Sequence, residues 1–381
     1  MSNFIEEIAI RLIEMPTNEK IVLYEEPGGI YRVEVELPLN SKVKPEEFPK
    51  IRDELGIPSY VDLDYLPIKA SLVMLKAARN AHQLHTEFPD VVPKRISNKP
   101  LNILIFGGGA FKLHCPSCNA GGVFERVLHD IDIVVPRKQG GEIRKLLLVL
   151  GDLYGTMFLH FISTSDKIFT MQRRGRRHRV RSIKTLGNEN DLPTVEVMDI
   201  LTNEIDMRHT VNVEDELKED QKKLLYTIGL EKMIATKCQF IMDMDKDVIP
   251  ELEQAGVLYR QLHYDHYNKD KIVIGMEKKD IKDVSAAFLD HPLGEGPEAI
   301  DVEKLKRILS DKKILKTVRL NLANILHNKD FLESTGASPS QISDITTKIE
   351  DLLEQLPKSD KKWSKPWWNL DVETPEIFEG N

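Results

Sequence analysis

Two aspartates stand at the start of an apolar run, in the sequence His129-Asp130-Ile131-Asp132-Ile133-Val134-Val135. Alternate residues of a strand point to the same side, so Asp130 and Asp132 are expected to hold two carboxylates side by side. Aspartate is disfavoured within strands, and adjacent carboxylates repel unless one is protonated or a cation lies between them. A hard divalent cation with oxygen ligands, Mg²⁺ or Mn²⁺, fits this pair. The alternative interpretation is a solvated strand start, where aspartate is common.

A glycine turn and a third carboxylate extend this pattern. Gly107-Gly108-Gly109 follows the apolar run of residues 101–106, and glycine lets backbone N–H groups come close to a phosphate. Asp199 lies inside another apolar run, residues 195–201. Three carboxylates on neighbouring strands beside a glycine turn suggest two-metal phosphoryl or nucleotidyl transfer, in which one metal holds the triphosphate and the other activates the acceptor hydroxyl.

A lysine falls near the centre of the apolar stripe of a helix expected over residues 228–243. The stripe around Lys237 is formed by Leu230, Met233, Ile234 and Ile241. A lysine on a buried face is unusual unless it is paired. Either its ammonium group extends out to solvent, or it reaches into a site and meets phosphate or carboxylate.

A second expected helix, over residues 279–290, carries two aspartates three positions apart. Residues at this spacing are neighbours on a helix surface. Asp280 lies at the edge of the apolar stripe, where a site could use it. Asp283 lies farther round, where solvation is sufficient to explain it.

These residues depend on elements that the hydrophobic pattern predicts. Short apolar runs predict strands over residues 101–106, 131–135, 157–161, 168–171 and 195–201, with a helix over 141–150. From residue 228 onward the pattern is mostly helical, with helices over 228–243, 246–255, 279–290, 301–328 and 340–356. Before residue 100, β-rich runs over 21–24 and 30–37 predict a hairpin, and residues 68–88 predict a helix. The middle of the chain is therefore expected to be α/β and the C-terminal part α.

Taken together, the ordered motifs resemble the nucleotidyltransferase superfamily that includes polymerase β, nearest to its abortive-infection toxin branch. The resemblance covers about residues 100–325 and rests on Gly107-Gly108-Gly109, Arg126, His129-Asp130-Ile131-Asp132, Val197-Met198-Asp199, Met207-Arg208-His209-Thr210, Thr236-Lys237-Cys238-Gln239, Lys279-Asp280-Ile281-Lys282-Asp283 and Asp290-His291.

This resemblance implies an α+β fold, in which a small mixed sheet with flanking helices is followed by a helical domain. The expected units are an N-terminal α/β accessory module (1–99), a nucleotidyltransferase core (100–225), a helical domain (226–330) and a helical C-terminal extension with its tail (331–381). Residues 1–99 and the tail lie outside the resemblance.

The resemblance also implies roles for individual residues. Asp130 and Asp132 are expected to bind Mg²⁺ or Mn²⁺, with Asp199 as the third carboxylate and general base. The nucleotide is expected to be held by Gly107, Gly108, Gly109, Arg126, Lys237 and Asp280.

The reaction implied is transfer of a nucleoside monophosphate from NTP to an RNA end, a protein hydroxyl or a small molecule, with release of pyrophosphate. A toxin-type enzyme would also have an antitoxin-like partner. The family turn is usually Gly-Ser, whereas this chain has Gly-Gly-Gly and lacks the hydroxyl that touches a phosphate. The alternative is therefore a catalytically degenerate nucleotide-binding or interaction protein of the same fold.

The composition of the chain argues against several classes of protein. The chain has 381 residues, a net charge of -8 and 3 cysteines. An acidic balance weakens the case for a general nucleic-acid coat, and too few cysteines are present for a disulfide framework. No apolar run approaches the roughly 20 residues that span a bilayer, so we expect a cytoplasmic protein that does not enter a membrane.

Two local clusters leave alternatives open. Cys115 and Cys118, beside His114, could bind zinc through residues brought together by the fold, or could be ordinary loop thiols. Six arginines within residues 173–181 could form a solvated loop, or a patch for the triphosphate or an RNA acceptor. Three tryptophans in the tail, Trp363, Trp367 and Trp368, could dock a partner or pack onto the helical domain.

Overall fold

The structure of the chain is a computed structural model. It describes residues 20–26, 30–36, 45–64, 66–87, 99–128, 131–154, 159–161, 170–171, 173, 176–184, 194–218, 226–243, 248–263, 271–358 and 361–369. Inside these ranges the side chains of residues 20–26, 30–36, 151–154, 159–161, 181–184, 194–197 and 199, and of some single positions elsewhere, are not described.

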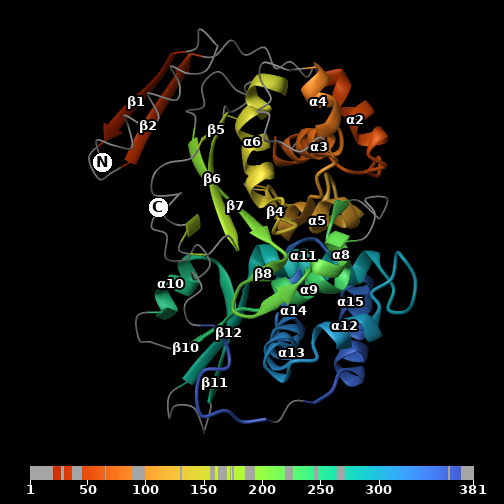
Figure 1. The fold of residues 1–381 in the computed structure, drawn as a ribbon. Coiled ribbons are helices and arrows are strands. Elements are labelled where there is room, and N and C mark those ends of the chain that lie inside the picture. The colour runs from red at the N-terminus through yellow and green to blue at the C-terminus, as the bar shows by residue number, and fades with distance from the viewer. Residues whose placement is uncertain are drawn as a thin grey trace.

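A five-stranded mixed sheet forms the upper part of the molecule in Figure 1. Its order is β3-β4-β7-β6-β5, with bounds β3 (Leu104–Phe106), β4 (Asp132–Val135), β5 (Leu159–Phe161), β6 (Arg177–Lys184) and β7 (Thr194–Thr202). β4 runs antiparallel to β3 and parallel to β7. Ile133, Val134 and Val135 are fully buried, as expected for a central strand covered on both faces.

Helices cover this sheet and extend below it. α6 (Gly140–Tyr154) packs between the sheet and α3 (Leu66–Arg79). Below them, α5 (Gly107–His114), α9 (Leu230–Lys237) and α11 (Lys278–Asp290) pack against one another in the middle of the molecule. These three helices connect the mixed sheet to the C-terminal part of the chain.

The C-terminal part contains a second sheet that the helical prediction missed. Three antiparallel strands in the order β10-β12-β11 occupy β10 (Ile241–Asp243), β11 (Val257–His263) and β12 (Lys271–Glu277). The helix expected over 228–243 therefore ends at Lys237, and the expected helical domain is mixed. The sheet forms because Ile272, Val273 and Ile274 are buried on both faces of β12, a continuous apolar run that helical periodicity does not distinguish.

The predicted N-terminal hairpin is confirmed. β1 (Lys20–Glu26) pairs antiparallel with β2 (Ile30–Glu36).

The largest cluster of buried hydrophobic side chains among the described residues includes side chains of α3, the mixed sheet and α11. Its first member in the sequence is Phe48 and its last is Leu356. The boundaries expected at residues 99, 225 and 330 stay predictions.

The remaining described elements are short or lie around these layers. They are η1 (Pro45–Glu47), α2 (Phe48–Glu54), α4 (Ala81–Glu87), η2 (Pro116–Cys118), β8 (Glu204–Asp206), β9 (Thr210–Asn212), α8 (Glu214–Lys218), α10 (Val248–Gln254), α12 (Val302–Ile308), α13 (Lys312–His327), α14 (Lys329–Ser334) and α15 (Pro339–Gln355).

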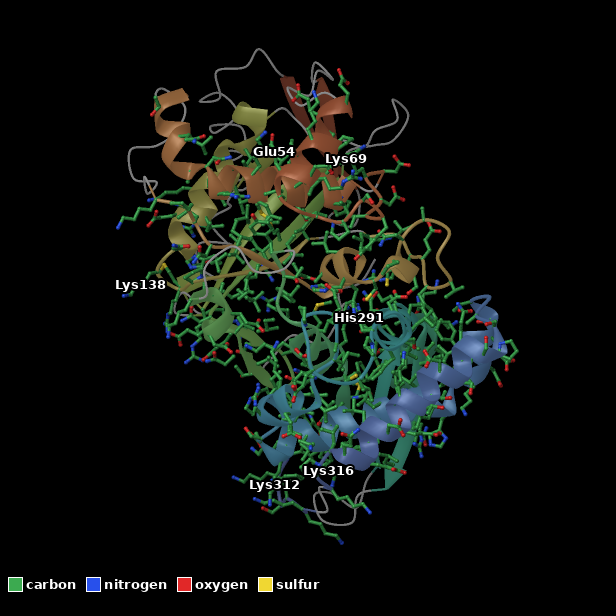
Figure 2. All side chains as sticks on the ribbon, turned by 90° about the vertical axis from the view of Figure 1, so that its right-hand side faces the viewer. Glu54, Lys69, Lys138, His291, Lys312 and Lys316 are labelled. Carbon is green, nitrogen blue, oxygen red and sulfur yellow. The ribbon has the colours of Figure 1, made fainter. Side chains whose placement is uncertain are left out.

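The tryptophan-containing segment packs back onto the C-terminal part of the chain. Trp367 and Trp368 are buried against Ile241, Ile272 and Ile274 of the three-stranded sheet. The indole Nε1 of Trp367 donates to Thr317 Oγ1 on α13 at 3.0 Å, and Figure 2 shows Lys312 and Lys316 at this lower end of the molecule. The described tryptophans therefore contribute to this core.

Candidate functional site

The site begins where β3 leaves the sheet. Phe106, the last residue of β3, pairs with Asp132, the first residue of β4. Gly107 follows with φ +62, a left-handed conformation that glycine adopts without strain. A methyl group on Gly107 would lie 2.9 Å from Cγ of Asp132 and still closer to its carboxylate oxygen. Glycine is therefore required here, because the Asp132 carboxylate occupies the space of a side chain.

The expected tight turn is the first turn of a helix. Gly107, Gly108 and Gly109 open α5, and its N-cap residue, Phe106, has no side chain that could accept a capping hydrogen bond. The first N–H groups of a helix have no intrahelical acceptor, and with the helix dipole they favour an anion. Gly109 faces the opposite way, since a Cβ there would meet Ile105 at 3.3 Å.

Arg126 lies directly against the backbone of Gly108. A Cβ on Gly108 would come within 2.7 Å of Cζ of Arg126. Its guanidinium donates from Nε and Nη2 to the two carboxylate oxygens of Asp283, each at 2.8 Å. This two-point geometry fixes the planar group more firmly than a single contact would.

Lys237 joins the same cluster from the end of α9. Its Nζ donates to Oδ1 of Asp280 and lies 3.5 Å from Oδ2 of Asp283. Only 15% of the lysine side chain is exposed, so the ammonium group is paired within the protein rather than extended to solvent. Gly107, Gly108, Asp132, Arg126, Lys237 and Asp280 thus form one continuous site.

Asp283 is central to this site, and the expectation that it is solvated was wrong. Its side chain is 1% exposed. Burial alone would raise the pKa of Asp283, but Arg126 and Lys237 outweigh burial and hold that pKa below its usual range. The helical pattern placed Asp283 outside the apolar stripe of its helix. Asp283 is buried nevertheless, because the cations of Arg126 and Lys237 face it from other parts of the chain.

The two cations are held in their charged forms by the same contacts. Burial favours loss of the proton from Lys237, but Asp280 and Asp283 together raise the pKa of its ammonium group. Burial also favours loss of the proton from Arg126, but Asp283 outweighs burial and raises the pKa of the guanidinium. Two cations and two anions therefore neutralise one another beside the glycine turn.

The other two predicted carboxylates are only partly placed. Asp130 lies outside the described residues. The backbone of Asp199 lies in β7, one position before the pair formed by Ile133 and Ile200, and opposite Arg179 of β6. Residues 132 and 199 are therefore adjacent in the parallel ladder, on neighbouring strands as the sequence predicted.

A metal fits the described part of this arrangement through Asp132. Carboxylate oxygen is the donor that Mg²⁺ prefers, and the carboxylate of Asp132 lies against Gly107 beside the N-terminus of α5. Among the described residues, no group of three or more His, Cys, Asp and Glu side chains could by itself hold a metal ion. The expected ligand set needs Asp130 and the side chain of Asp199, which are not among the described groups.

The cysteines lie in a rigid turn behind the glycines. Cys115 and Cys118 are free and buried. Nζ of Lys112 donates to the carbonyl of Cys118 at 2.7 Å, and Asn119 donates to the carbonyls of Lys112 and Cys115. Burial raises the pKa of the Cys115 thiol. These hydrogen bonds stabilise the turn, and zinc binding by the two cysteines stays a prediction.

The arginine tract lies largely in a strand. Residues 177–181 belong to β6, between β7 and β5, so the solvated-loop interpretation was wrong for them. His178 is half-buried, and burial with the nearby Arg144 lowers its pKa to about 4. Residue 174 lies outside the described part of the chain, so contact with a phosphate stays a prediction.

No protein-family model matches the chain, and no curated protein matches it in sequence. Among the described residues, no helix combines the length and apolar character needed to cross a membrane.

Proposed function

We propose that the chain is a Mg²⁺-dependent nucleotidyltransferase, with a fold of the polymerase β type, that moves a nucleoside monophosphate from NTP to an acceptor. The observation that carries the proposal is the contact between Asp132 and Gly107. It places a carboxylate beside the N-terminus of α5, which is the pairing of metal ligand and phosphate cradle that such a reaction needs.

The neighbouring strands support the same assignment. β3, β4 and β7 are adjacent in a mixed sheet, with the glycines after β3, Asp132 at the start of β4 and Asp199 within β7. Asp130, Asp132 and Asp199 would hold Mg²⁺ or Mn²⁺, which when bound would neutralise the triphosphate and activate the acceptor hydroxyl. Asp199 would accept the proton of that hydroxyl as general base.

The other residues would bind and orient the nucleotide. The N–H groups at the start of α5 would contact phosphate oxygens. Arg126 would add positive charge beside Gly108, where Asp283 holds its guanidinium in one orientation. Lys237 at the end of α9 is paired with Asp280 in the first turn of α11, and both would contact the nucleotide from the C-terminal part of the chain.

The test is transfer of label from each α-³²P-labelled NTP, with Mg²⁺ or Mn²⁺, to total RNA, to protein or to a small-molecule fraction. Wild type should transfer label and release pyrophosphate, and Asp132→Asn should abolish both because it removes a charge while keeping the shape. Asp351→Asn, at an exposed position of α15, is the matched control and should transfer normally. Equal transfer by Asp132→Asn and wild type would exclude this site.

A second candidate is nucleotide binding without turnover. The first turn of α5 is formed by glycines and carries no hydroxyl, and the neighbouring charges of Arg126, Asp283, Lys237 and Asp280 are already paired. This candidate predicts NTP binding that depends on Asp132 but no transfer to any acceptor. Absence of both transfer and NTP binding would exclude both candidates.

A further inference from the structure

A cavity of about 370 Å³ lies at the other end of α5 from the glycine turn. β3, α8, the start of α9 and the loop at residues 296–299 surround it, and Lys304 of α12 closes one side. Its apolar wall comes from Ile103, Leu104, Leu217 and Leu230. A volume of this size lies within the range of small-molecule sites.

One carboxylate in the cavity is incompletely satisfied. Oε1 of Glu216 accepts a hydrogen bond from the N–H of Gly229 at 3.2 Å and lies 3.6 Å from Nζ of Lys232. Oε2 is buried and has no hydrogen-bond partner among the described residues. Burial raises the pKa of Glu216 although Lys232 and Lys304 oppose that shift. A buried acceptor in this state is costly, so the cavity favours a ligand that donates a hydrogen bond.

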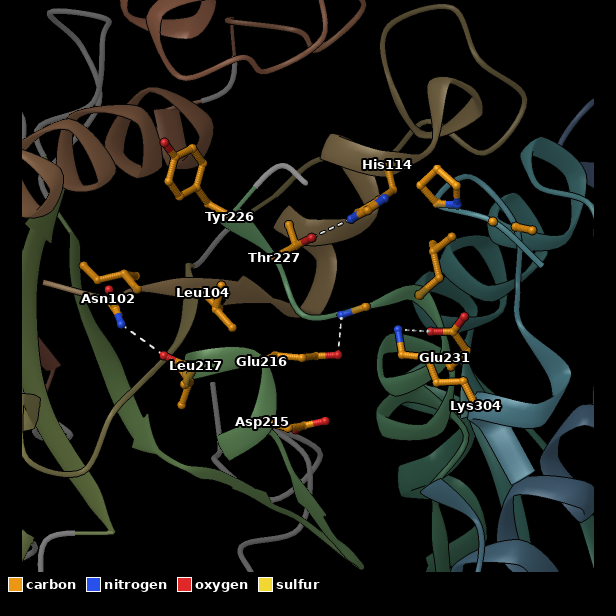
Figure 3. A pocket seen from close by; sticks show the side chains of 16 residues that line it. Asn102, Leu104, His114, Asp215, Glu216, Leu217, Tyr226, Thr227, Glu231 and Lys304 are labelled. Atoms are coloured by element: carbon orange, nitrogen blue, oxygen red, sulfur yellow. Dashed lines mark hydrogen bonds and ion pairs between the residues drawn. The ribbon is translucent and has the colours of Figure 1, made fainter. Parts of the chain in front are cut away.

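The other charged groups around the cavity lie in ion pairs, although Oε2 of Glu231, like Oε2 of Glu216, has no hydrogen-bond partner among the described residues. Glu231 accepts from the N–H of Asp301 at 2.8 Å and pairs with Nζ of Lys304 at 2.9 Å. Asp215 pairs with Lys232 at 2.6 Å. Figure 3 shows Glu216 extending from α8 toward the pair formed by Glu231 and Lys304.

The balance of charge favours a cation. Three carboxylates (Asp215, Glu216, Glu231) face two lysines (Lys232, Lys304), so three negative and two positive charges leave a net charge of −1. The only imidazole in the wall, His114, bonds to Thr227 Oγ1, and burial lowers its pKa to about 3. A neutral imidazole adds no positive charge, so the site disfavours an anion.

We propose that this cavity binds a small aliphatic amine, whose ammonium group pairs with the carboxylate of Glu216 while its hydrocarbon part packs against Leu104 and Leu230. The ammonium group supplies both the donor and the positive charge that the cavity lacks. The hydrocarbon part matches the apolar wall. This inference is independent of the proposed transferase activity, because it involves none of Asp132, Arg126 or Lys237.

Isothermal titration with n-butylammonium chloride at constant ionic strength tests the proposal on the full chain. Wild type should bind it saturably. 1-Butanol, which has the same carbon chain without the charge, should bind more weakly, and butyrate should not bind. Glu216→Gln should weaken n-butylammonium binding by about tenfold or more, since a hydrogen bond to a charged group is lost.

Glu214→Gln is the matched control. Glu214 lies on the same short helix, but its side chain is exposed and pairs with Lys218, so n-butylammonium affinity should not change. Glycine-selective ¹⁵N labelling of the wild type gives a readout that does not depend on the folding of a variant. The amide signals of Gly229 and Gly296, which line the cavity, should shift with n-butylammonium, whereas that of Gly336 should not.

Three results would overturn the proposal. The first is no saturable binding of n-butylammonium, which would mean that water satisfies Glu216. The second is equal affinity in Glu216→Gln and wild type. The third is glycine shifts that omit Gly229.

Discussion

The charge network at the site predicts a large loss of stability on removal of a single charge. In Asp283→Asn the shape is kept, but Arg126 loses the carboxylate that accepts its two hydrogen bonds at 2.8 Å. Arg126 is 13% exposed, so water replaces the carboxylate poorly, whereas Lys237 keeps Asp280. Breaking one side of a buried ion pair costs roughly 3–5 kcal/mol. Because Lys237 keeps Asp280 as a partner, we expect the free energy of unfolding to fall by about 3 kcal/mol, at the lower end of this range.

Urea unfolding followed by circular dichroism measures this loss. The control is Asp344→Asn, which removes an exposed carboxylate paired with Lys348 one helical turn away and should cost about 0.5 kcal/mol or less. Adding Arg126→Gln completes a double-mutant cycle, with an expected coupling of about 2 kcal/mol. The reasoning is refuted if Asp283→Asn costs less than about 1 kcal/mol, or if the cycle shows no coupling.

The same variant should change the dependence of stability on pH. The folded-state pKa of Asp283 is depressed below the value of 3.8 that applies to the unfolded chain. Its stabilisation is therefore complete above that value and is lost as the pH falls through the lower folded-state pKa. Asp283→Asn lacks this contribution, so its free energy of unfolding should fall less steeply than that of wild type below about pH 4.

Three further predictions concern other parts of the structure. Gly107→Ala should abolish Asp132-dependent NTP binding and lower the free energy of unfolding by more than about 1 kcal/mol, because its methyl group would overlap Asp132. Gly121→Ala is the control, since Gly121 has a similar φ of +75 but open space around it. The urea midpoint of Gly107→Ala should therefore be lower than that of Gly121→Ala. Burial, with His291 and Lys304, lowers the pKa of His114 to about 3. As the pH drops from about 6.5 toward 3, the unfolded chain binds a proton at this histidine before the folded chain does, so the free energy of unfolding should fall. His114→Gln should reduce this dependence of stability on pH, and an unchanged dependence would contradict the lowered pKa of His114. Trp367→Ala should cost roughly 3–5 kcal/mol and make residues 361–369 sensitive to limited proteolysis, since Trp367 is 1% exposed; Trp363→Ala, at a half-buried position, should cost less.

Local patterns in the sequence were sufficient to predict the elements around the glycine turn. Apolar runs predicted the strands that became β3, β4 and β7, and the glycines and Asp132 lie at the strand ends as expected. The N-terminal hairpin was predicted for the same reason, since two β-rich runs close together in the sequence, 21–24 and 30–37, form a pattern that depends only on neighbouring residues. Helical periodicity likewise predicted α11 and α15. The α+β class was implied by the family resemblance, and the described helices and sheets belong to that class.

Tertiary structure decided which charged residues form the site. Arg126 and Asp283 are 157 residues apart in sequence, and neither residue by itself shows that the other will be buried against it. The same holds for Glu216, which pairs with Gly229 and Lys232 only because α8 packs beside the start of α9. A short-range pattern reports whether a position suits a helix or a strand. Whether a charge can be buried depends on partners that only the folded chain brings within hydrogen-bonding distance.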